Sequence, residues 1–206
     1  ENNLERSFYE KQSILENWSV RELRRQRNSS LFQRLALSKD KAGILKLAKE
    51  GRIIETEEDI LHSPYILEFL NLPEPKFSEK ELEAKIIKHL QSFLLELGKG
   101  FAFIASQYRI TINNKHYHAD LVFYHVVLKC YVLIDLKLGE VQHYHIGQMN
   151  MYLSYFETEV SVENDNMPIG IILSQSKDEV MVEYATRGLS NKLFISRYQT
   201  YLPNKE

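Results

Sequence analysis

Two aspartates and one lysine stand out in the stretch from Tyr117 to Leu138, which otherwise consists mainly of β-branched, aromatic and leucine residues. That composition is typical of β-strands with at least one covered face. Asp120, Asp135 and Lys137 place charges within these apolar strands. The stretch therefore predicts a charged site built into a buried β-hairpin.

The alternation of side chains along a strand decides which of these charges share a face. In the second strand of the predicted hairpin, Asp135 and Lys137 are two residues apart and point the same way. Antiparallel pairing about a turn near residues 127–128 places Asp120 opposite Asp135. No Asn-Gly or Gly-Gly pair marks that turn, so a register shifted by two residues is the alternative.

Two carboxylates at this separation repel each other, and burying them is costly unless a cation or a proton lies between them. A divalent metal ion resolves the conflict. Hard oxygen ligands select Mg²⁺ or Mn²⁺, which bind through one or two carboxylates and the phosphate oxygens of a substrate. A nearby lysine can orient an attacking water or stabilise charge in the transition state. Asp120, Asp135 and Lys137 thus predict phosphodiester hydrolysis.

These residues resemble the D…(D/E)-x-K signature of the PD-(D/E)XK nuclease superfamily, with Asp120 followed by Asp135, Leu136 and Lys137. More closely, the chain is similar to the bacterial YhcG-type nuclease family over nearly its whole length. Ala119 stands where the nominal motif has proline, and Asp135 stands where many relatives carry glutamate. The segments that carry the family resemblance are residues 18–26, 35–41, 101–104, 120–125, 132–139, 147–152 and 169–173.

The resemblance implies an α/β restriction-endonuclease-like core of order α-β-β-β-α-β, a mixed central sheet flanked by helices. It also implies that Asp120, Asp135 and the backbone carbonyl of Leu136 bind the metal, while Lys137 positions the water. In this superfamily a glutamate from the first helix often completes the metal site, and Glu83 matches that position by face.

The predicted first helix of this core begins at Ser78, whose spacing to Glu81 has the form of a capping box, and runs to about Leu97. Glu83 lies on its apolar stripe, and Glu79 lies on nearly the same side. Glu83 is favoured over Glu79, although either acid can instead be a solvated first-turn residue that complements the helix dipole.

A helix predicted over roughly Tyr144 to Glu157 places Gln148 and Tyr152 on one face, because they are four residues apart. The pair resembles the Gln-x-x-x-Tyr element of some nucleases of the superfamily. This implies that Gln148 takes part in catalysis and that Tyr152 contacts nucleic acid; an ordinary surface pair is the alternative. Zinc is a weaker alternative to magnesium, based on four histidines: His116, His118, His143 and His145.

The remaining elements are read from caps, turns and apolar runs. A short helix is predicted to begin at Ser63-Pro64, and the segment Leu72-Pro-Glu-Pro-Lys76 is the best linker candidate. The predicted domains are a helical N-terminal domain, residues 1–72, and a nuclease domain, residues 77–206. Within the latter, the first strand is predicted over residues 101–106, and residues 107–112 run from it into a turn at residues 113–115. Further strands are predicted over residues 169–174 and 193–197, with a helix over residues 180–187 between them.

The N-terminal segment is basic although the whole chain has a net charge of −2. Residues 1–52 hold 12 Lys and Arg against 7 Asp and Glu, whereas residues 53–206 hold 14 against 21. Arg21, Arg24 and Arg25 lie on one short helical stretch and are expected to contact the DNA backbone. A helix-turn-helix, a helical dimerisation hairpin and a solvated helix face are alternative readings.

Composition limits the class of protein. The chain has 206 residues, of which 44% are hydrophobic, enough for a core, and no apolar run long enough to span a bilayer. The single cysteine, Cys130, predicts no disulfide framework and a cytoplasmic location. The chain begins at Glu1, which predicts that the natural protein extends upstream.

The sequence as a whole predicts a Mg²⁺- or Mn²⁺-dependent endodeoxyribonuclease that acts in restriction, repair or recombination. DNA is the expected partner, together with a second copy of the chain in a homodimer or higher homo-oligomer, without a membrane partner. Two alternatives remain. One is a catalytically silent DNA-binding or assembly module on the nuclease fold, and the other is a nuclease that acts on branched DNA or RNA.

Overall fold

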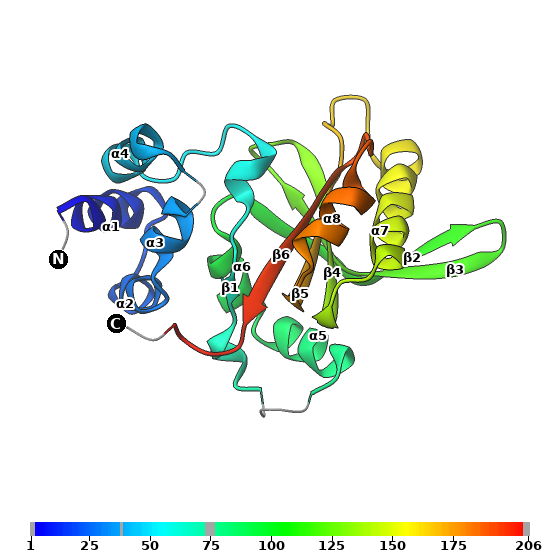
Figure 1. Ribbon diagram of the computed structural model, residues 1–206, viewed down its shortest axis with the longest axis horizontal. Coiled ribbons are helices and arrows are strands. Elements are labelled where there is room, and N and C mark those ends of the chain that lie inside the picture. The colour runs from blue at the N-terminus through cyan, green and yellow to red at the C-terminus, as the bar shows by residue number, and fades with distance from the viewer. Residues whose placement is uncertain (1–2, 38, 73–76, 204–206) are drawn as a thin grey trace.

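The structure is a computed structural model that describes residues 3–37, 39–72 and 77–203. In this part of the chain a mixed sheet is flanked by helices, and a group of short helices lies at one end (Figure 1). That group comprises α1 (Asn3–Leu15), α2 (Val20–Asn28), α3 (Leu31–Ala36) and α4 (Lys41–Glu50). The segment that joins it to the rest of the chain holds η1 (Glu57–Ile60), β1 (Tyr65–Ile66) and η2 (Glu68–Leu70).

The remaining elements build the sheet and its cover. The helices are α5 (Glu79–Lys88), α6 (Leu90–Leu97), α7 (His143–Tyr155), the π-helical turn η3 (Phe156–Val160) and α8 (Glu179–Thr186). The strands are β2 (Phe101–Ile112), β3 (Lys115–His125), β4 (Cys130–Glu140), β5 (Ile169–Ser176) and β6 (Lys192–Gln199). The described helices include none that is long and apolar enough to cross a membrane.

The sheet has the strand order β1-β6-β5-β4-β3-β2. The pairs β2–β3 and β3–β4 are antiparallel, whereas β4–β5, β5–β6 and β1–β6 are parallel. The parallel step from β4 to β5 is reached through α7, as expected for a helical crossover. The predicted mixed sheet and the order α-β-β-β-α-β are confirmed.

The short helix predicted at Ser63-Pro64 is wrong. The two following residues form β1, in which Tyr65 pairs with Tyr198 of β6 and both β1 residues are fully buried. Burial of these apolar side chains against the sheet outweighs the local signal of a serine cap before proline.

The predicted hairpin register is confirmed. Leu121 pairs with Ile134 and His125 with Cys130, and continuing this register places Asp120 opposite Asp135. The turn between the strands lies at residues 126–129, where Lys129 adopts a positive φ of 49°. That left-handed residue allows a tight turn without the Asn-Gly pair.

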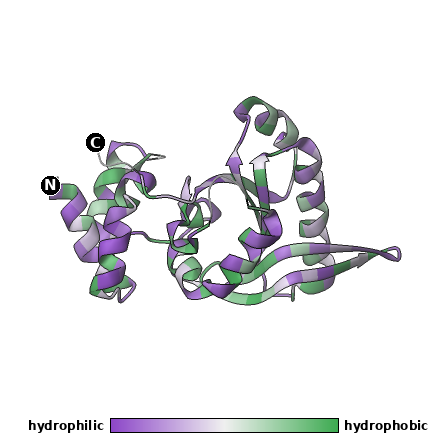
Figure 2. Ribbon diagram, turned by 90° about the horizontal axis from the view of Figure 1, so that it is seen from below, coloured by the Kyte–Doolittle hydropathy of each residue, from purple (hydrophilic) through white to green (hydrophobic). Residues whose placement is uncertain are grey.

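Beyond the pairing with β4, β2 and β3 continue as an arm of two strands that projects from the body (Figure 1). Asn113 and Asn114 form its tip with φ of 46° and 60°, as their tolerance of positive φ predicts. Polar and apolar residues alternate along the arm (Figure 2). Ile110 is buried, whereas Arg109 and Thr111 are exposed, so the arm has one covered face and one open face.

Each face of the sheet has its own apolar core. On the α5–α6 side, β4 contributes Val132, Ile134 and Leu136 to one buried cluster. On the α7 side, Leu133 packs with the buried residues of the helix. Because Asp135 is two residues from Leu133, it lies on the α7 face, as the predicted alternation requires. The residues that α7 buries are Ile146, Met149, Tyr152 and Leu153.

The predicted single helix from Ser78 to Leu97 is in fact two helices. The backbone leaves the helical region at His89, with φ of −113° and ψ of 33°, and α6 then continues to Leu97. After this turn, α6 buries both Phe93 and the carboxylate of Glu96. The residues that pair with the Glu96 carboxylate are distant in the sequence. Helical spacing alone therefore does not reveal that the helix breaks at His89.

The helices α1 to α4 bury a separate small core that includes Phe8 and Phe32. Leu31, Phe32 and Leu35 of α3 also pack in this core. Residues 60–72 instead pack with the sheet, since Ile60 and Leu70 are fully buried in its core. A domain division between residues 72 and 77 stays a prediction, and most of that linker lies outside the described residues.

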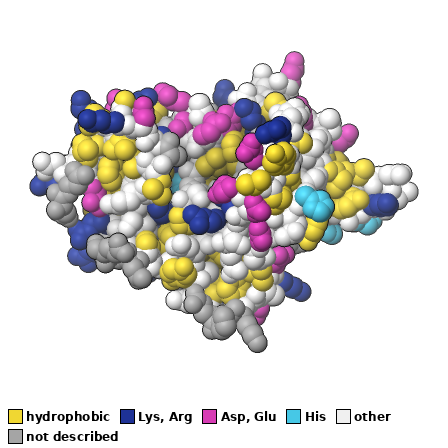
Figure 3. Space-filling model, viewed as in Figure 1, with side chains coloured by type: hydrophobic (Ala, Val, Ile, Leu, Met, Phe, Trp, Pro, Cys, Tyr) yellow, Lys and Arg dark blue, Asp and Glu magenta, His cyan; other side chains and the backbone are white. Residues whose placement is uncertain are grey.

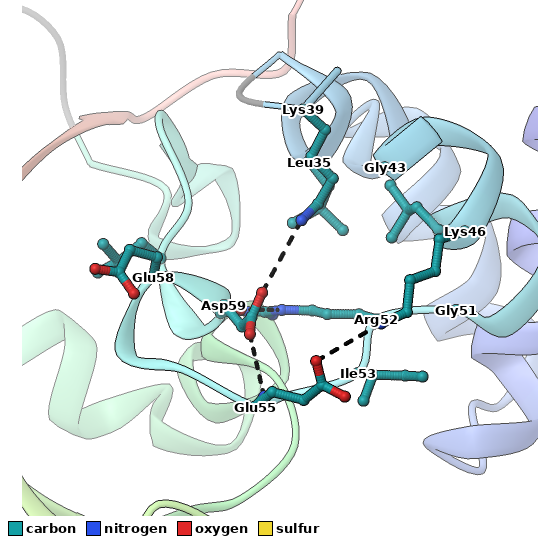
Figure 4. A pocket seen from close by; sticks show the side chains of 12 residues that line it. Leu35, Lys39, Gly43, Lys46, Gly51, Arg52, Ile53, Glu55, Glu58 and Asp59 are labelled. Atoms are coloured by element: carbon teal, nitrogen blue, oxygen red, sulfur yellow. Dashed lines mark hydrogen bonds and ion pairs between the residues drawn. The ribbon is translucent and has the colours of Figure 1, made fainter. Parts of the chain in front are cut away.

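A pocket at the junction of α3, α4 and η1 is lined by charges that pair with each other (Figure 4). Lys39 Nζ lies 3.9 Å from Asp59 Oδ1, and Lys46 Nζ lies 3.6 Å from Glu55 Oε2. Arg52 donates an Nε–H bond of 2.7 Å to the carbonyl of Asp59. The pocket is therefore best explained as a junction between α1–α4 and the sheet.

Candidate active site

The carboxylates of Asp120 and Asp135 meet where β3 and β4 separate. Asp120 Oδ2 accepts a 2.8 Å hydrogen bond from the backbone N–H of Leu136, which holds the side chain against β4. Asp135 is 3% exposed, and the two carboxyl groups are close enough to share a hydrogen bond. The predicted pair of acids is therefore present in the folded chain.

Ionising both acids of this pair is unfavourable. Burial and the charge of Asp135 together raise the pKa of Asp120 to about 7, against the opposing hydrogen bond from the N–H of Leu136. A proton or a cation shared by the two acids therefore relieves this repulsion. A divalent ion is the kind of ligand that removes this conflict.

Lys137 lies on the same strand end and connects the acid pair to the backbone. Its Nζ is 2.8 Å from Asp135 Oδ2 and donates a 3.0 Å hydrogen bond to the carbonyl of Leu136. Burial opposes its charged form, but the nearby carboxylates together outweigh burial and raise the pKa of the ammonium. Because one ammonium reaches both oxygens, the carboxylate and the carbonyl converge on a common point.

Helix α5 brings both of its candidate acids to this site. Ser78 caps the helix in the predicted capping box with Glu81. Glu79 accepts a 3.0 Å hydrogen bond from the N–H of Leu138 and lies 3.8 Å from Lys137 Nζ. Glu83, one turn later, lies on the Asp120 side, and burial together with the charge of Asp120 raises its pKa.

Gln107 of β2 joins the site, although it was not among the residues predicted from the sequence. Its Nε2 donates hydrogen bonds of 2.8 Å to Glu83 Oε2 and 3.1 Å to Asp120 Oδ1. The sequence carries no local signal for this role, because Gln107 reads as one polar residue on the open side of a strand.

The prediction made for Gln148 and Tyr152 on α7 needs a correction. Gln148 is partly exposed, but Tyr152 is fully buried, so the Tyr152 side chain cannot contact nucleic acid as predicted. Its ring lies 6.4 Å from that of Tyr117, and its hydroxyl accepts a hydrogen bond from Gln148 Nε2. Helical spacing identified the shared face, but that face turns toward the sheet. Tyr152 therefore orients Gln148.

Comparison with known proteins identifies the family. The family model described as "YhcG PDDEXK nuclease domain" matches residues 58–206. The chain belongs to the YhcG nuclease family. YhcG of Escherichia coli (strain K12) is 37% identical over 201 residues, which are 98% of this chain and 53% of that protein. The chain thus spans about half the length of this relative, and its resemblance to the family is confirmed.

Solved structures have lower similarity to this YhcG-family chain. A repair endonuclease from Pyrococcus abyssi is 16% identical, with a TM-score of 0.42, covering 63% of this chain and 50% of that one. EndoMS in its apo form is 14% identical, with a TM-score of 0.40, covering 65% of this chain and 50% of that one.

The oxygen atoms of the site fit a hard divalent cation. The candidate ligands are the carboxylates of Asp120 and Asp135 and the carbonyl of Leu136, which are the oxygen donors that Mg²⁺ prefers. Over the described residues, no three or more His, Cys, Asp or Glu side chains gather as a metal cluster. Glu83 faces the site through Gln107. The imidazole of His116, one of the four histidines on which the zinc alternative is based, is hydrogen-bonded to the guanidinium of Arg109.

The basic residues predicted on α2 divide into two groups. Arg21 and Arg24 are exposed, as DNA contact requires. The prediction that Arg25 contacts the DNA backbone needs a correction. Its guanidinium points inward and pairs with Glu68 at 3.0 Å and Glu96 at 3.1 Å. The clustering of arginines on one helix does not reveal which of them faces the body of the protein.

Proposed function

We propose that this YhcG-family chain carries the catalytic part of a metal-dependent endodeoxyribonuclease, which hydrolyses phosphodiester bonds in DNA during restriction, repair or recombination. The supporting observation is the convergence of two carboxylates, one backbone carbonyl and one ammonium at the end of β4. Mg²⁺ or Mn²⁺ held by Asp120, Asp135 and the carbonyl of Leu136, with Glu83 nearby, would stabilise negative charge that develops on the phosphate.

The side chains around this point have distinct roles in the proposal. Asp120 and Asp135 supply the negative charge that attracts the cation. Lys137, whose ammonium stays charged among these acids, donates a hydrogen bond to the attacking water or to a phosphate oxygen. Gln148, oriented by Tyr152, lies on α7 beside the same sheet face and supplies a further amide to the reacting strand.

The test is cleavage of supercoiled plasmid and of a four-way junction by the wild type and by Asp135→Ala, with Mg²⁺, with Mn²⁺ and with a chelator. We expect metal-dependent cutting that the substitution abolishes. Glu140→Ala is the matched control, because Glu140 is an exposed acid at the end of the same strand. Folded wild-type protein that cuts neither DNA with either metal would favour a silent binding module, whereas cutting of the junction alone would favour a branched-DNA nuclease.

The β2–β3 arm offers a DNA-contacting surface that continues from the site. The stretch from Lys99 to Ala119 holds no Asp or Glu. On the open face of the arm, Arg109 pairs across the strands with His118, and its guanidinium lies 2.8 Å from His116 Nε2. In Figure 3, histidine side chains gather where the arm leaves the body, with basic side chains farther out. The basic side chains of the arm, with no acid among them, suit contact with a phosphate backbone.

Arg109→Ala combined with Lys115→Ala is therefore expected to weaken DNA binding several-fold, measured by fluorescence anisotropy in the inactive Asp135→Ala background. Losing two phosphate contacts should reduce the salt slope of log K by about one to two. Arg21→Ala with Arg24→Ala should weaken binding less, since α2 lies at the opposite end of the molecule (Figure 1). Lys11→Ala is the control, and unchanged affinity of the Arg109→Ala, Lys115→Ala variant would contradict this assignment.

Two further parts of the proposal concern the assembly and the compartment. Cutting both strands of a duplex favours two copies of the chain, so we propose a homodimer or higher homo-oligomer, which light scattering with and without DNA would test. The free, buried thiol of Cys130 suits a reducing compartment, and we propose the cytoplasm. Fluorescence of a tagged full-length protein in its native cell would test this location.

A further inference from the structure

Gln107 adopts an unusual backbone conformation in the middle of β2. Its φ is +49°, in the left-handed region that residues other than glycine rarely adopt and that among them favours Asn, Asp and His. Ser106 pairs with Leu121 and Tyr108 pairs with Ala119, so Gln107 lies across from Asp120 at a position where the ladder has no pair. The ladder between β2 and β3 therefore lacks one residue pair directly beside the two acids.

The left-handed backbone at Gln107 directs its side-chain amide toward two acids from different elements. Nε2 donates to Glu83 on α5 at 2.8 Å and to Asp120 on β3 at 3.1 Å. The second oxygen of Asp120 already accepts from the N–H of Leu136. Both oxygens of Asp120 are therefore held, one by β4 and one by Gln107. Strained residues of this kind cluster at functional sites, where the surrounding structure maintains them.

We propose that Gln107 is a positioning residue of the metal site, whose amide ties Glu83 of α5 to Asp120. This inference rests on the proposed nuclease function. Without the amide, two carboxylates that repel each other would separate, and Glu83 would leave the edge of the site. Groups that orient metal-binding carboxylates in this way commonly affect metal affinity 10- to 100-fold, roughly, when they are removed.

Two substitutions separate the amide from the backbone. Gln107→Gly removes the amide and tolerates the positive φ, so the variant is expected to fold and to melt at the wild-type temperature or above. Gln107→Asn also tolerates the positive φ, but its amide is one methylene shorter and falls short of the two acids. Asn114→Gly is the matched control, since Asn114 also has a positive φ, at the tip of the arm.

The experiment is calorimetric titration of Mn²⁺ into each folded protein, with thermal unfolding and plasmid cleavage measured in parallel. Gln107→Gly and Gln107→Asn should each lower Mn²⁺ affinity about tenfold or more, while Asn114→Gly keeps wild-type affinity. Unchanged or tighter binding in either Gln107 variant would overturn the inference while leaving the nuclease proposal intact. A wild type that neither binds Mn²⁺ nor cleaves DNA would overturn both.

Discussion

Lys137→Ala is expected to reduce DNA cleavage by about 100-fold to 1000-fold, the range typical of losing one preorganised donor to a transition state. Mn²⁺ affinity is expected to stay the same or to rise. The physical reason is that the Lys137 ammonium lies 2.8 Å from Asp135 Oδ2 and 3.0 Å from the carbonyl of Leu136. The ammonium and a bound cation therefore interact with the same oxygens, whereas only the ammonium carries a donor N–H.

The measurement combines single-turnover cleavage with calorimetric titration of Mn²⁺ on the same preparations. Lys137→Met is the matched control for the length of the side chain, and it should behave as the alanine variant does. Lys129→Ala removes an amine from the turn before the same strand and should leave both quantities unchanged. Cleavage by Lys137→Ala at the wild-type rate would remove this residue from the catalytic machinery.

Glu96→Ala is expected to lower the free energy of unfolding by about 3 to 5 kcal/mol, as when one partner of a buried ion pair is removed. Glu96 is 1% exposed, and its two oxygens lie 2.6 Å from Arg34 Nη1 and 3.1 Å from Arg25 Nη2. It also accepts a 2.8 Å hydrogen bond from the N–H of Ile66. Removing the carboxylate takes one charge partner from each of two buried guanidinium groups, although Arg25 keeps its pair with Glu68.

The pH dependence of the stability that Glu96 contributes has a defined sign. Burial of Glu96 opposes its charged form, but Arg34 and Arg25 together hold its pKa far below its ordinary value. A lowered pKa in the folded state adds stability above the ordinary pKa of glutamate, near 4.3 or so, and this stability is lost as the pH falls below that value. Glu96→Ala should therefore lose more stability at pH 7 than at pH 3.

Chemical denaturation followed by circular dichroism at the two pH values is the measurement. Glu10→Ala is the control, because Glu10 pairs with Arg6 on an exposed face of α1 and should change stability by less than about 1 kcal/mol. Equal, small effects of Glu10→Ala and Glu96→Ala would contradict a structural role for the buried cluster. The same cluster joins α2 and α3 to β1, so its loss should also weaken the attachment of the N-terminal helices.

Local sequence patterns determined the elements and the acid pair. Strand alternation and the short distance between the two strands placed Asp120 opposite Asp135 with Lys137 on the same face, because hairpin pairing depends on nearby residues. The cap at Ser78 and the turn at residues 113–114 were equally readable, since each depends on hydrogen bonds or φ preferences within a few residues.

Tertiary structure alone decided which side chains face inward and which distant residues join the site. The sequence indicated an arginine cluster and a Gln-x-x-x-Tyr pair, but packing turned Arg25 toward Glu96 and buried Tyr152. Gln107 reaches Glu83 across 24 residues through a left-handed backbone that no local pattern indicates. Periodicity specifies the face of an element, whereas long-range packing and charge pairing specify what that face meets.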